Sequence, residues 1–240
     1  MSTTKPDDVR ARAVVVVAAG SGGPTPLAAA VRRVGPLCRA RVGSGGSIRI
    51  GTRRPDDPLA AVMGERAELE PVDAVIELTA AGGGGLADAV GFVDGILATL
   101  DDTADPLRSA VIVGSAHRFL AGDGALFVAL AGRRDSAISI DELSRWWLEQ
   151  HGPLALALAD PLPRAYEQLH ADGGASAAAA ARAGVPARGY DMCATISVDS
   201  MSDLAGTVMD AEVGAKLFED ELGHVDHAHL RGAVQDLLVV

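Results

Sequence analysis

The chain has 240 residues, of which 48% are apolar but only 3% aromatic, and its formal net charge is −11. This length suffices for one large domain or two small ones around a core of Ala, Val, Leu and Ile. The negative charge argues against binding to nucleic acid or to an anionic membrane surface.

The N-terminal stretch MSTTKPDDVR is polar and charged, so we expect no secretory signal peptide. No apolar run reaches the roughly 18 residues that a membrane helix needs. Cys38 and Cys193 are far apart and lack the spacing of metal ligands. We therefore expect a cytoplasmic protein in which both cysteines are small buried hydrophobic residues.

The first half of the chain predicts the order strand, helix, strand, strand, helix, strand. The apolar runs and amphipathic stretches that carry these elements are 11–20, 24–37, 38–51 (a strand or hairpin), 72–80, 85–100 and 108–119. Prolines mark the start of the first helix, and Gly35-Pro36 is expected to end it.

The second half repeats this order. Its strands are expected at 125–134, 163–170, 190–198 and 231–240, and its helices at 139–156 and 200–213. The Gly-Asp-Gly turn within 118–126 separates a first domain, 1–121, from a second, 122–240. The Ala/Gly-rich segment 171–188 reads as a loose loop that could act as a lid.

Local matches between the halves indicate an internal duplication. Gly-Pro-Leu ends the first helix of each half, 72–78 resembles 190–196, and Arg108-Ser-Ala-Val resembles Arg231-Gly-Ala-Val. The order β-α-β-β-α-β is the ferredoxin-like unit, whose sheet has one bare face. We predict an α+β fold of two fused ferredoxin-like repeats that bury these faces against each other in a pseudo-dimeric barrel.

The helix expected at 139–156 has a well-marked start, because Ser139 and Glu142 form a capping box. Leu143, Trp147 and His151 then fall on one face. His151 is placed in the last turn, where the helix dipole favours a positive charge. A histidine there either caps carbonyl groups or ends a functional stripe.

In the strand at 163–170, alternation places Arg164, Tyr166, Gln168 and His170 on one face. A solvated edge strand would show the same pattern. If this face instead points into the space between two sheets, it offers a proton shuttle and hydrogen-bond donors for a developing oxyanion.

At this point the residues resemble a known family. SIDELSRWWLEQHGPL resembles the signature helix of the EthD family of dimeric α+β barrels, and RAYEQLH resembles that family's second strand. YDMCATISVDSMSDL is similar to its third strand and following helix, with Met192 in place of a glycine. LFEDELGHVDH (217–227) is similar to the acidic segment before the last strand. The resemblance covers about 125–240.

The resemblance implies a small cofactor-free enzyme, a lyase or isomerase acting on an aromatic or lactone-like metabolite. It assigns His151 and His170 as acid/base groups and Tyr166 as a hydrogen-bond donor. The further ligand-binding candidates are Trp147, Gln168, Arg164 and, more weakly, Asp191. No cofactor or metal is expected.

The first half keeps the architecture without this chemistry, because Val34 stands where the second half has His151. It is expected to supply only a facing sheet, from which Arg39, Arg41 or Arg49 either reaches a ligand or lies on the surface.

Other classes of function stay open. The HVDHAH segment, with His224, Asp226, His227 and His229, either binds a transition metal or is a solvated connection. Other barrels of two ferredoxin-like halves bind haem through one histidine. A non-catalytic protein that binds an apolar metabolite would need the same cavity. The expected partner is a small molecule, and a homo-oligomer of the pseudo-dimer is plausible.

Overall fold

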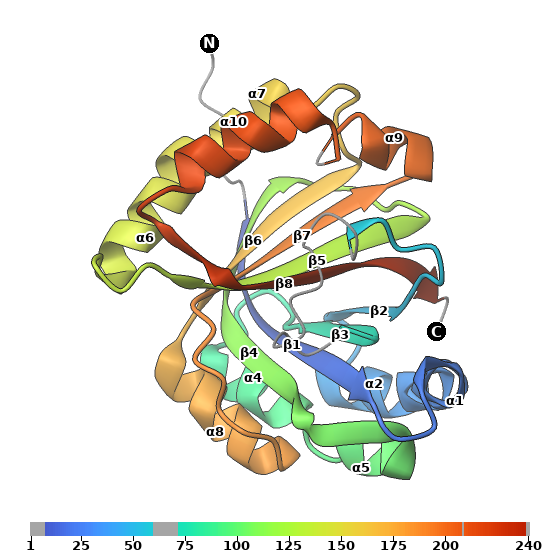
Figure 1. Cartoon of the computed structure of the whole chain (residues 1–240). Helices are drawn as coiled ribbons and strands as arrows, with labels where there is room; N and C mark the ends of the chain where they lie inside the picture. The colour runs from blue at the N-terminus through green and yellow to red at the C-terminus, as the bar shows by residue number, and fades with distance from the viewer. Residues whose placement is uncertain (1–7, 60–71, 208, 239–240) are drawn as a thin grey trace.

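The computed structural model describes residues 8–59, 72–207 and 209–238. Its strands form a closed antiparallel barrel in the order β1-β3-β2-β8-β5-β7-β6-β4 (Figure 1). The strands are β1 (Asp8–Ala19), β2 (Ser47–Arg53), β3 (Ala74–Thr79), β4 (Ala104–Leu120), β5 (Leu126–Arg134), β6 (Ala165–Ala171), β7 (Met192–Val198) and β8 (Val225–Leu238). The α+β barrel expected from the sequence is thus confirmed.

Each half of the chain contributes four strands in the same relative order. The first half gives β4-β1-β3-β2 and the second gives β8-β5-β7-β6. The halves join at two seams, where β2 pairs with β8 and β4 pairs with β6. Because the barrel closes at both seams, it has no free sheet edge.

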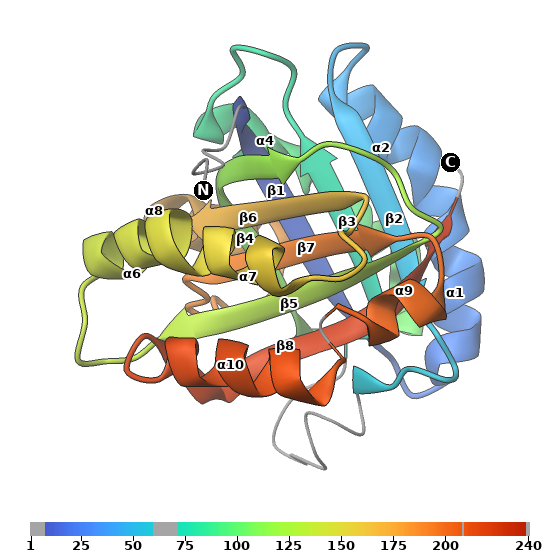
Figure 2. The ribbon, with the colours of Figure 1, turned by 90° about the horizontal axis from the view of Figure 1, so that it is seen from above.

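Helices cover the outside of the barrel on two opposite sides (Figures 1 and 2). Those of the first half are α1 (Pro24–Val31), α2 (Gly35–Val42), α4 (Leu86–Phe92) and α5 (Ile96–Leu100). Those of the second half are α6 (Ile140–Trp146), α7 (Gly152–Leu158), α8 (Gly173–Ala183), α9 (Met201–Ala205) and α10 (Ala211–Glu221).

The Gly-Pro pairs do not end the helices, contrary to the prediction. In the first half a 3-10 turn, Arg32–Val34, leads into α2, and in the second a π-helical turn, Trp147–His151, leads into α7. Each proline lies in the first turn of the new helix, where its missing N–H costs no hydrogen bond. His151 is therefore in the middle of a continuous helical segment, not in its last turn.

The segment 171–188 is not a loose loop. It forms α8, which begins at the cap Asp172 and lies with the helices of the first half (Figure 1). The Ser176 hydroxyl bonds both the N–H and the carbonyl oxygen of Val113 in β4, at 2.9 and 3.1 Å. Packing against β4 makes α8 part of the fold of the first half and excludes a role as a lid over the second.

Three element boundaries also differ from the prediction. The last strand begins at Val225, so most of HVDHAH is strand, and residues 38–42 extend α2 because Gly43 is the first break. The helix expected at 200–213 is split into α9 and α10, each with its own cap, Ser200 and Asp210.

Three layers of buried side chains result. The barrel interior is apolar around Val14, Ile112 and Phe127, and each helix layer forms a separate core against the outside of the sheet. Both cysteines are buried and free, as expected, and burial raises the pKa of Cys38 to about 11. No helix in the described part of the chain is both long and apolar enough to cross a membrane.

Candidate active site

A cavity of about 300 Å³ lies between the outer face of the second-half sheet and the helices above it. Its walls are mostly apolar, and its polar side chains come from separate elements. The apolar wall includes Leu130, Trp147, Met192, Ile196, Leu217 and Phe218, and the polar lining is His151, Tyr166, Glu221 and His227. Figure 2 shows α7 and α10 lying across this sheet.

His151 projects from the π-helical turn and is only 8% exposed. Its Nδ1 atom lies 2.9 Å from Oδ2 of Asp220 in α10, and its Nε2 atom is 3.9 Å from Oε1 of Glu221. The wider π turn is a recurrent feature of functional sites in helices. A carboxylate on Nδ1 fixes the ring orientation and leaves Nε2 for a ligand.

A second histidine-carboxylate pair lines the same cavity. Nε2 of His227, on β8, lies 2.7 Å from Oε2 of Glu221. The Phe218 ring is 4.5 Å from the His227 ring and covers it from α10. The two adjacent carboxylates of α10 therefore serve two different histidines.

Tyr166, Gln168 and His170 share one face of β6, as alternation predicted, but that face is the outer one. Tyr166 belongs to the core under α7, whereas Leu169 belongs to the barrel interior. The face that reads as polar is thus covered by helices, and Glu167 points into the barrel instead. Period two shows which residues share a face, not which side of the sheet that face is on.

Gln168 holds this row of side chains in place. Its Nε2 donates to the carbonyl oxygen of Trp147 at 3.0 Å and to the hydroxyl of Tyr166 at 2.7 Å. Since Tyr166 accepts this bond, its own proton is free to donate into the cavity. Burial raises the pKa of Tyr166 well above its usual value, which keeps the hydroxyl protonated.

Gly152 lets the helix approach the sheet closely. A Cβ atom there would lie 2.5 Å from Cζ of Phe119 and 3.0 Å from Nε2 of Gln168. The Phe119 ring in turn stacks on Tyr166 at 5.3 Å. The glycine of the Gly-Pro pair is therefore needed for packing and not for ending the helix.

The other sequence candidates lie away from the cavity. His170 packs between the rings of Trp147 and His117, at 4.8 and 4.5 Å. Arg164 is largely exposed and pairs with Asp199. The carboxylate of Asp191 accepts the backbone N–H of Arg134. Of the predicted site residues, the structure brings His151, Tyr166 and Trp147 together around the cavity, with Gln168 behind Tyr166.

The histidines of the HVDHAH segment point to different places, because His224 precedes β8 and the pairing of β8 with β5 shifts register between Asp226 and Arg231. His224 stacks on Trp146 at 4.2 Å, His227 lines the cavity and His229 pairs with Asp226 near the surface. Within the described residues, no group of three or more ligating side chains is arranged to hold a metal ion.

Sequence reasoning missed Asp220, Glu221 and the role of His227 in the cavity. The acidic segment 217–227 was noted only as part of the family resemblance. Its helical spacing does carry a signal, since Leu217, Asp220 and Glu221 fall three and four residues apart on one face of α10.

The corresponding space in the first half is filled. Leu27, Val31 and Val34 are fully buried against Ile76 and Leu78 of β3. The Val34 side chain, at the position that matches His151, is thus part of a solid apolar core, as the sequence predicted for a half without this chemistry.

Comparisons with known proteins agree with this picture. The model of the EthD domain matches residues 136–228. No curated protein sequence gives a significant match. The match therefore covers the half that contains the cavity.

Three solved structures illustrate the fold. An anthrone oxidase-like protein has a TM-score of 0.60 and 10% identity, with 97% of this chain and 93% of that chain covered. A chlorite dismutase variant from Candidatus Nitrospira defluvii has a TM-score of 0.53 and 11% identity, covering 96% and 92%. A Rhodococcus jostii DypB variant in complex with heme has a TM-score of 0.54 and 12% identity, covering 96% and 93%.

At such low identities the structural likeness establishes the fold alone. The domain match is independent of it and falls on the residues that build the cavity. Residues 136–228 of this chain match the EthD domain, and they lie within a closed α+β barrel whose fold is similar to that of the anthrone oxidase-like protein.

Proposed function

We propose that the protein is an enzyme that moves protons on a small aromatic or lactone-like metabolite, as an isomerase or a dehydrating lyase. The observation that carries the proposal is that His151, paired with Asp220, and Tyr166 line the same mostly apolar cavity. A base and a donor that face the same bound molecule are the elements of general acid-base catalysis.

In this proposal His151 is the base. Asp220 accepts the Nδ1–H proton, so the lone pair of Nε2 is available to take a proton from a carbon next to a carbonyl group. The imidazolium that forms is stabilised by the Asp220 carboxylate. Returning the proton to another atom of the substrate completes an isomerisation, whereas protonating a leaving hydroxide completes a dehydration.

Tyr166 stabilises the charge that develops on the carbonyl oxygen. Its hydroxyl accepts from Gln168 and donates to the oxygen, and the fixed Gln168 amide keeps it in that orientation. His227, which is paired with Glu221, is the second acid/base group that lines the cavity. His170 contacts Gln168 only at 3.4 Å and supports this row from behind.

The cavity favours a compact apolar substrate. Its volume of about 300 Å³ is at the lower end of ordinary ligand sites, and its wall is mainly aliphatic and aromatic. One or two rings with a carbonyl group match both the volume and the small number of polar side chains.

Haem is an alternative because one neighbour of the same fold is in complex with it. Here Nε2 of His151 would be the iron ligand, since Nδ1 is bonded to Asp220. That atom instead faces Glu221 at 3.9 Å, and Leu217 and Phe218 of α10 stand over the cavity. These residues do not fit a wide macrocycle.

The proposal is tested with the bicyclic aromatic ketone 1-tetralone in deuterated buffer, by following deuterium incorporation next to the carbonyl group by NMR. We expect exchange above the buffer rate, reduced by about 10²- to 10⁴-fold in His151→Gln. His229→Gln, a surface histidine paired with Asp226, is the matched control. Equal rates in the two variants would contradict the role of His151.

The same experiment separates an enzyme from a carrier. Trp146 and Trp147 are the chain's two tryptophans, and Trp147 lines the cavity, so bound ketone should quench their fluorescence. Quenching without exchange in the unmodified protein would favour a non-catalytic binding protein. An absorption band typical of haem in the purified protein would favour the haem alternative.

The matching strand orders further lead us to propose that the two halves, 1–121 and 122–240, are duplicated ferredoxin-like repeats, of which only the second keeps a ligand cavity. Assembly of this pseudo-dimer into a homo-oligomer in the cytoplasm stays a prediction.

A further inference from the structure

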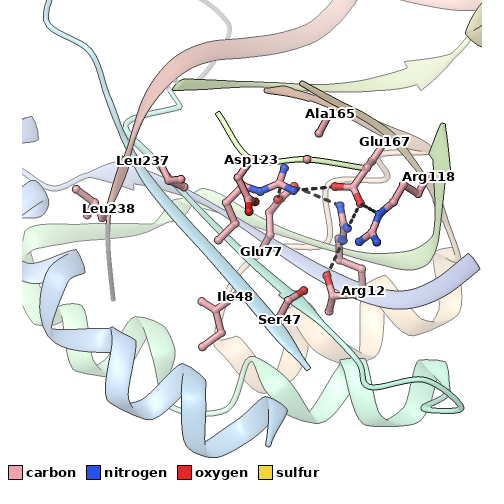
Figure 3. Close-up of a pocket in the computed structure, with 13 residues that line it drawn as sticks. Arg12, Ser47, Ile48, Glu77, Arg118, Asp123, Ala165, Glu167, Leu237 and Leu238 are labelled. Carbon is pink, nitrogen blue, oxygen red and sulfur yellow. Dashed lines mark hydrogen bonds and ion pairs between the residues drawn. The ribbon is translucent and has the colours of Figure 1, made fainter. Parts of the chain in front are cut away.

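A second cavity, of about 410 Å³, lies on the opposite side of β6, inside the mouth of the barrel (Figure 3). Its lining is polar, whereas the centre of the barrel interior around Val14, Ile112 and Phe127 is apolar. The charged side chains that face it are Arg12, Arg49, Glu77, Arg118, Asp123 and Glu167. They come from both halves of the chain, and none of them belongs to the proposed active site.

Glu167 is surrounded by three arginines of the first half. Its Oε1 accepts from Arg12 at 2.8 Å and from Arg118 at 2.9 Å, and its Oε2 accepts from Arg49 at 2.9 Å. These guanidinium groups outweigh the burial penalty and hold the pKa of Glu167 well below its usual value. The carboxylate therefore stays ionised.

Glu77 is the other buried carboxylate of the cluster. It accepts from the Thr195 hydroxyl at 2.6 Å and lies 3.1 Å from Nη1 of Arg49. The third carboxylate of the cavity lining, Asp123, is exposed and forms no ion pair within the described residues. The ion-paired cluster, in which three guanidinium groups face two buried carboxylates, therefore carries one positive charge. Asp8, at the edge, does not remove it, because Asp8 is itself paired with Arg10 at 2.7 Å.

The donors of this cluster are not all used. Nη1 of Arg49 is in ion-pair contact with Oε2 of Glu77, but the geometry is not that of a hydrogen bond. Arg118 bonds Glu167 through Nε, and its Nη1 is 3.6 Å from Asp8, too far for a hydrogen bond. The Nη groups of these two arginines can therefore donate hydrogen bonds to a ligand in the cavity.

We propose that the barrel mouth binds a small organic monoanion through its carboxylate, held by Arg49 and Arg118. The positive charge of the ion-paired cluster matches one carboxylate, and planar guanidinium groups bind that group with two parallel hydrogen bonds. The ion-pair cluster alone would join the two halves, but it would not need an open space of this size beside it.

The charge of Asp123 can be used to distinguish an anionic ligand from a cationic one. It is an exposed carboxylate on the turn between the halves and lines the same cavity. Near a bound anion Asp123 is repulsive, whereas near a bound cation it would be attractive. Removing its charge therefore has opposite effects on the two classes of ligand.

The test is calorimetric titration of the full chain with sodium lactate at low ionic strength, with neutral lactamide as the comparison. We expect lactate to bind and lactamide not to bind. Arg49→Gln and Arg118→Gln should each weaken lactate binding by about tenfold or more, because each removes charge-assisted hydrogen bonds. Asp123→Asn should strengthen it.

Arg182→Gln is the matched control, since Arg182 pairs with Asp94 on the surface of α8, away from the cavity. If Arg49→Gln does not fold, Arg118→Gln carries the test, because its side chain is 29% exposed. Absence of lactate binding, equal binding of lactamide, or weaker binding in Asp123→Asn would each overturn the proposal.

Discussion

The two helix-covered faces of the barrel are built alike and filled differently. In the first half the fully buried side chains of Leu27, Val34 and Ile76 pack together between sheet and helices. In the second half the same space is hollow and contains His151 and Tyr166. A fold of this kind needs one solid core to be stable, and it can use the second to hold a ligand.

The difference also shows in the helices. The helices of the first half include buried residues throughout, whereas α10 has none that is fully buried along its described length. The cavity is therefore covered by a helix that is less deeply buried than the helices of the first half. This contrast can be tested by changes that affect one half or the joint between the halves.

The largest effect is expected at the joint. Glu167→Gln leaves Arg12, Arg49 and Arg118 without their shared carboxylate and should lower the free energy of unfolding by about 4 kcal/mol, measured by urea denaturation. Asp199→Asn, which breaks the exposed pair with Arg164, is the control and should cost below about 1 kcal/mol. Similar small losses in both variants would mean that the joint does not depend on this cluster.

The next largest effect distinguishes the two helix layers directly. Leu27→Ala removes a fully buried side chain from the solid core and should cost about 3 kcal/mol in unfolding free energy. Leu217→Ala, in the half-buried wall of the active-site cavity, should cost below about 1 kcal/mol while it changes ligand affinity. Thermal and urea denaturation of both variants measure this, and equal costs would remove the contrast.

Gly152→Ala should cost about 2 kcal/mol, because its methyl group would collide with Phe119 and push the helix away from Gln168. Gly173→Ala, at the open start of α8, has no atom within 4 Å of the added methyl group and should be neutral or slightly stabilising. Differential scanning calorimetry of the pair measures this, and a neutral Gly152→Ala would show that the close approach is not essential.

The smallest effect is a dependence of stability on pH. Burial, with a further contribution from His117, lowers the pKa of His170 from 6.5 to about 3. Below pH 6.5 the unfolded chain binds a proton that the folded chain does not, so stability should fall by up to about 1.4 kcal/mol per pH unit. Glu167 adds its own loss only at lower pH, below its ordinary pKa of 4.5.

The measurement is urea denaturation between pH 7.5 and 5. His170→Asn should reduce the slope, and His229→Asn, a partly exposed histidine, should leave it unchanged. A slope that is the same in all three proteins would assign the pH dependence to other groups, such as His117.

The sequence predicts much of the fold, because apolar runs and periodicity are local signals. The order of strands, the capping box at Ser139 and the shared face of Tyr166 and Gln168 are all confirmed. The side of the sheet on which Tyr166 lies could not be read from alternation. It depends on which helices pack there, and α8 crosses to the other half.

The residues of the candidate active site could be predicted only in part from the sequence, for a similar reason. His151 is found from its place in the helix motif, but Asp220 lies 69 residues further along the chain, and only the packing of α10 brings it to Nδ1. The charged cluster at the barrel mouth is even harder to predict from the sequence. For Arg49 the sequence left open whether it contacts a ligand or lies on the surface. Arg12, Glu77 and Glu167 are single charges in apolar strands, and they come together only when the barrel closes.

The position of α8 has a consequence for how the chain folds as it is synthesised. When residue 121 has left the ribosome, all the strands of the first half are present, but β4 and α4 still lack the helix that covers them. The apolar surface of the nascent first half is therefore covered only after residue 183 has been made. Until then this surface can aggregate with other chains.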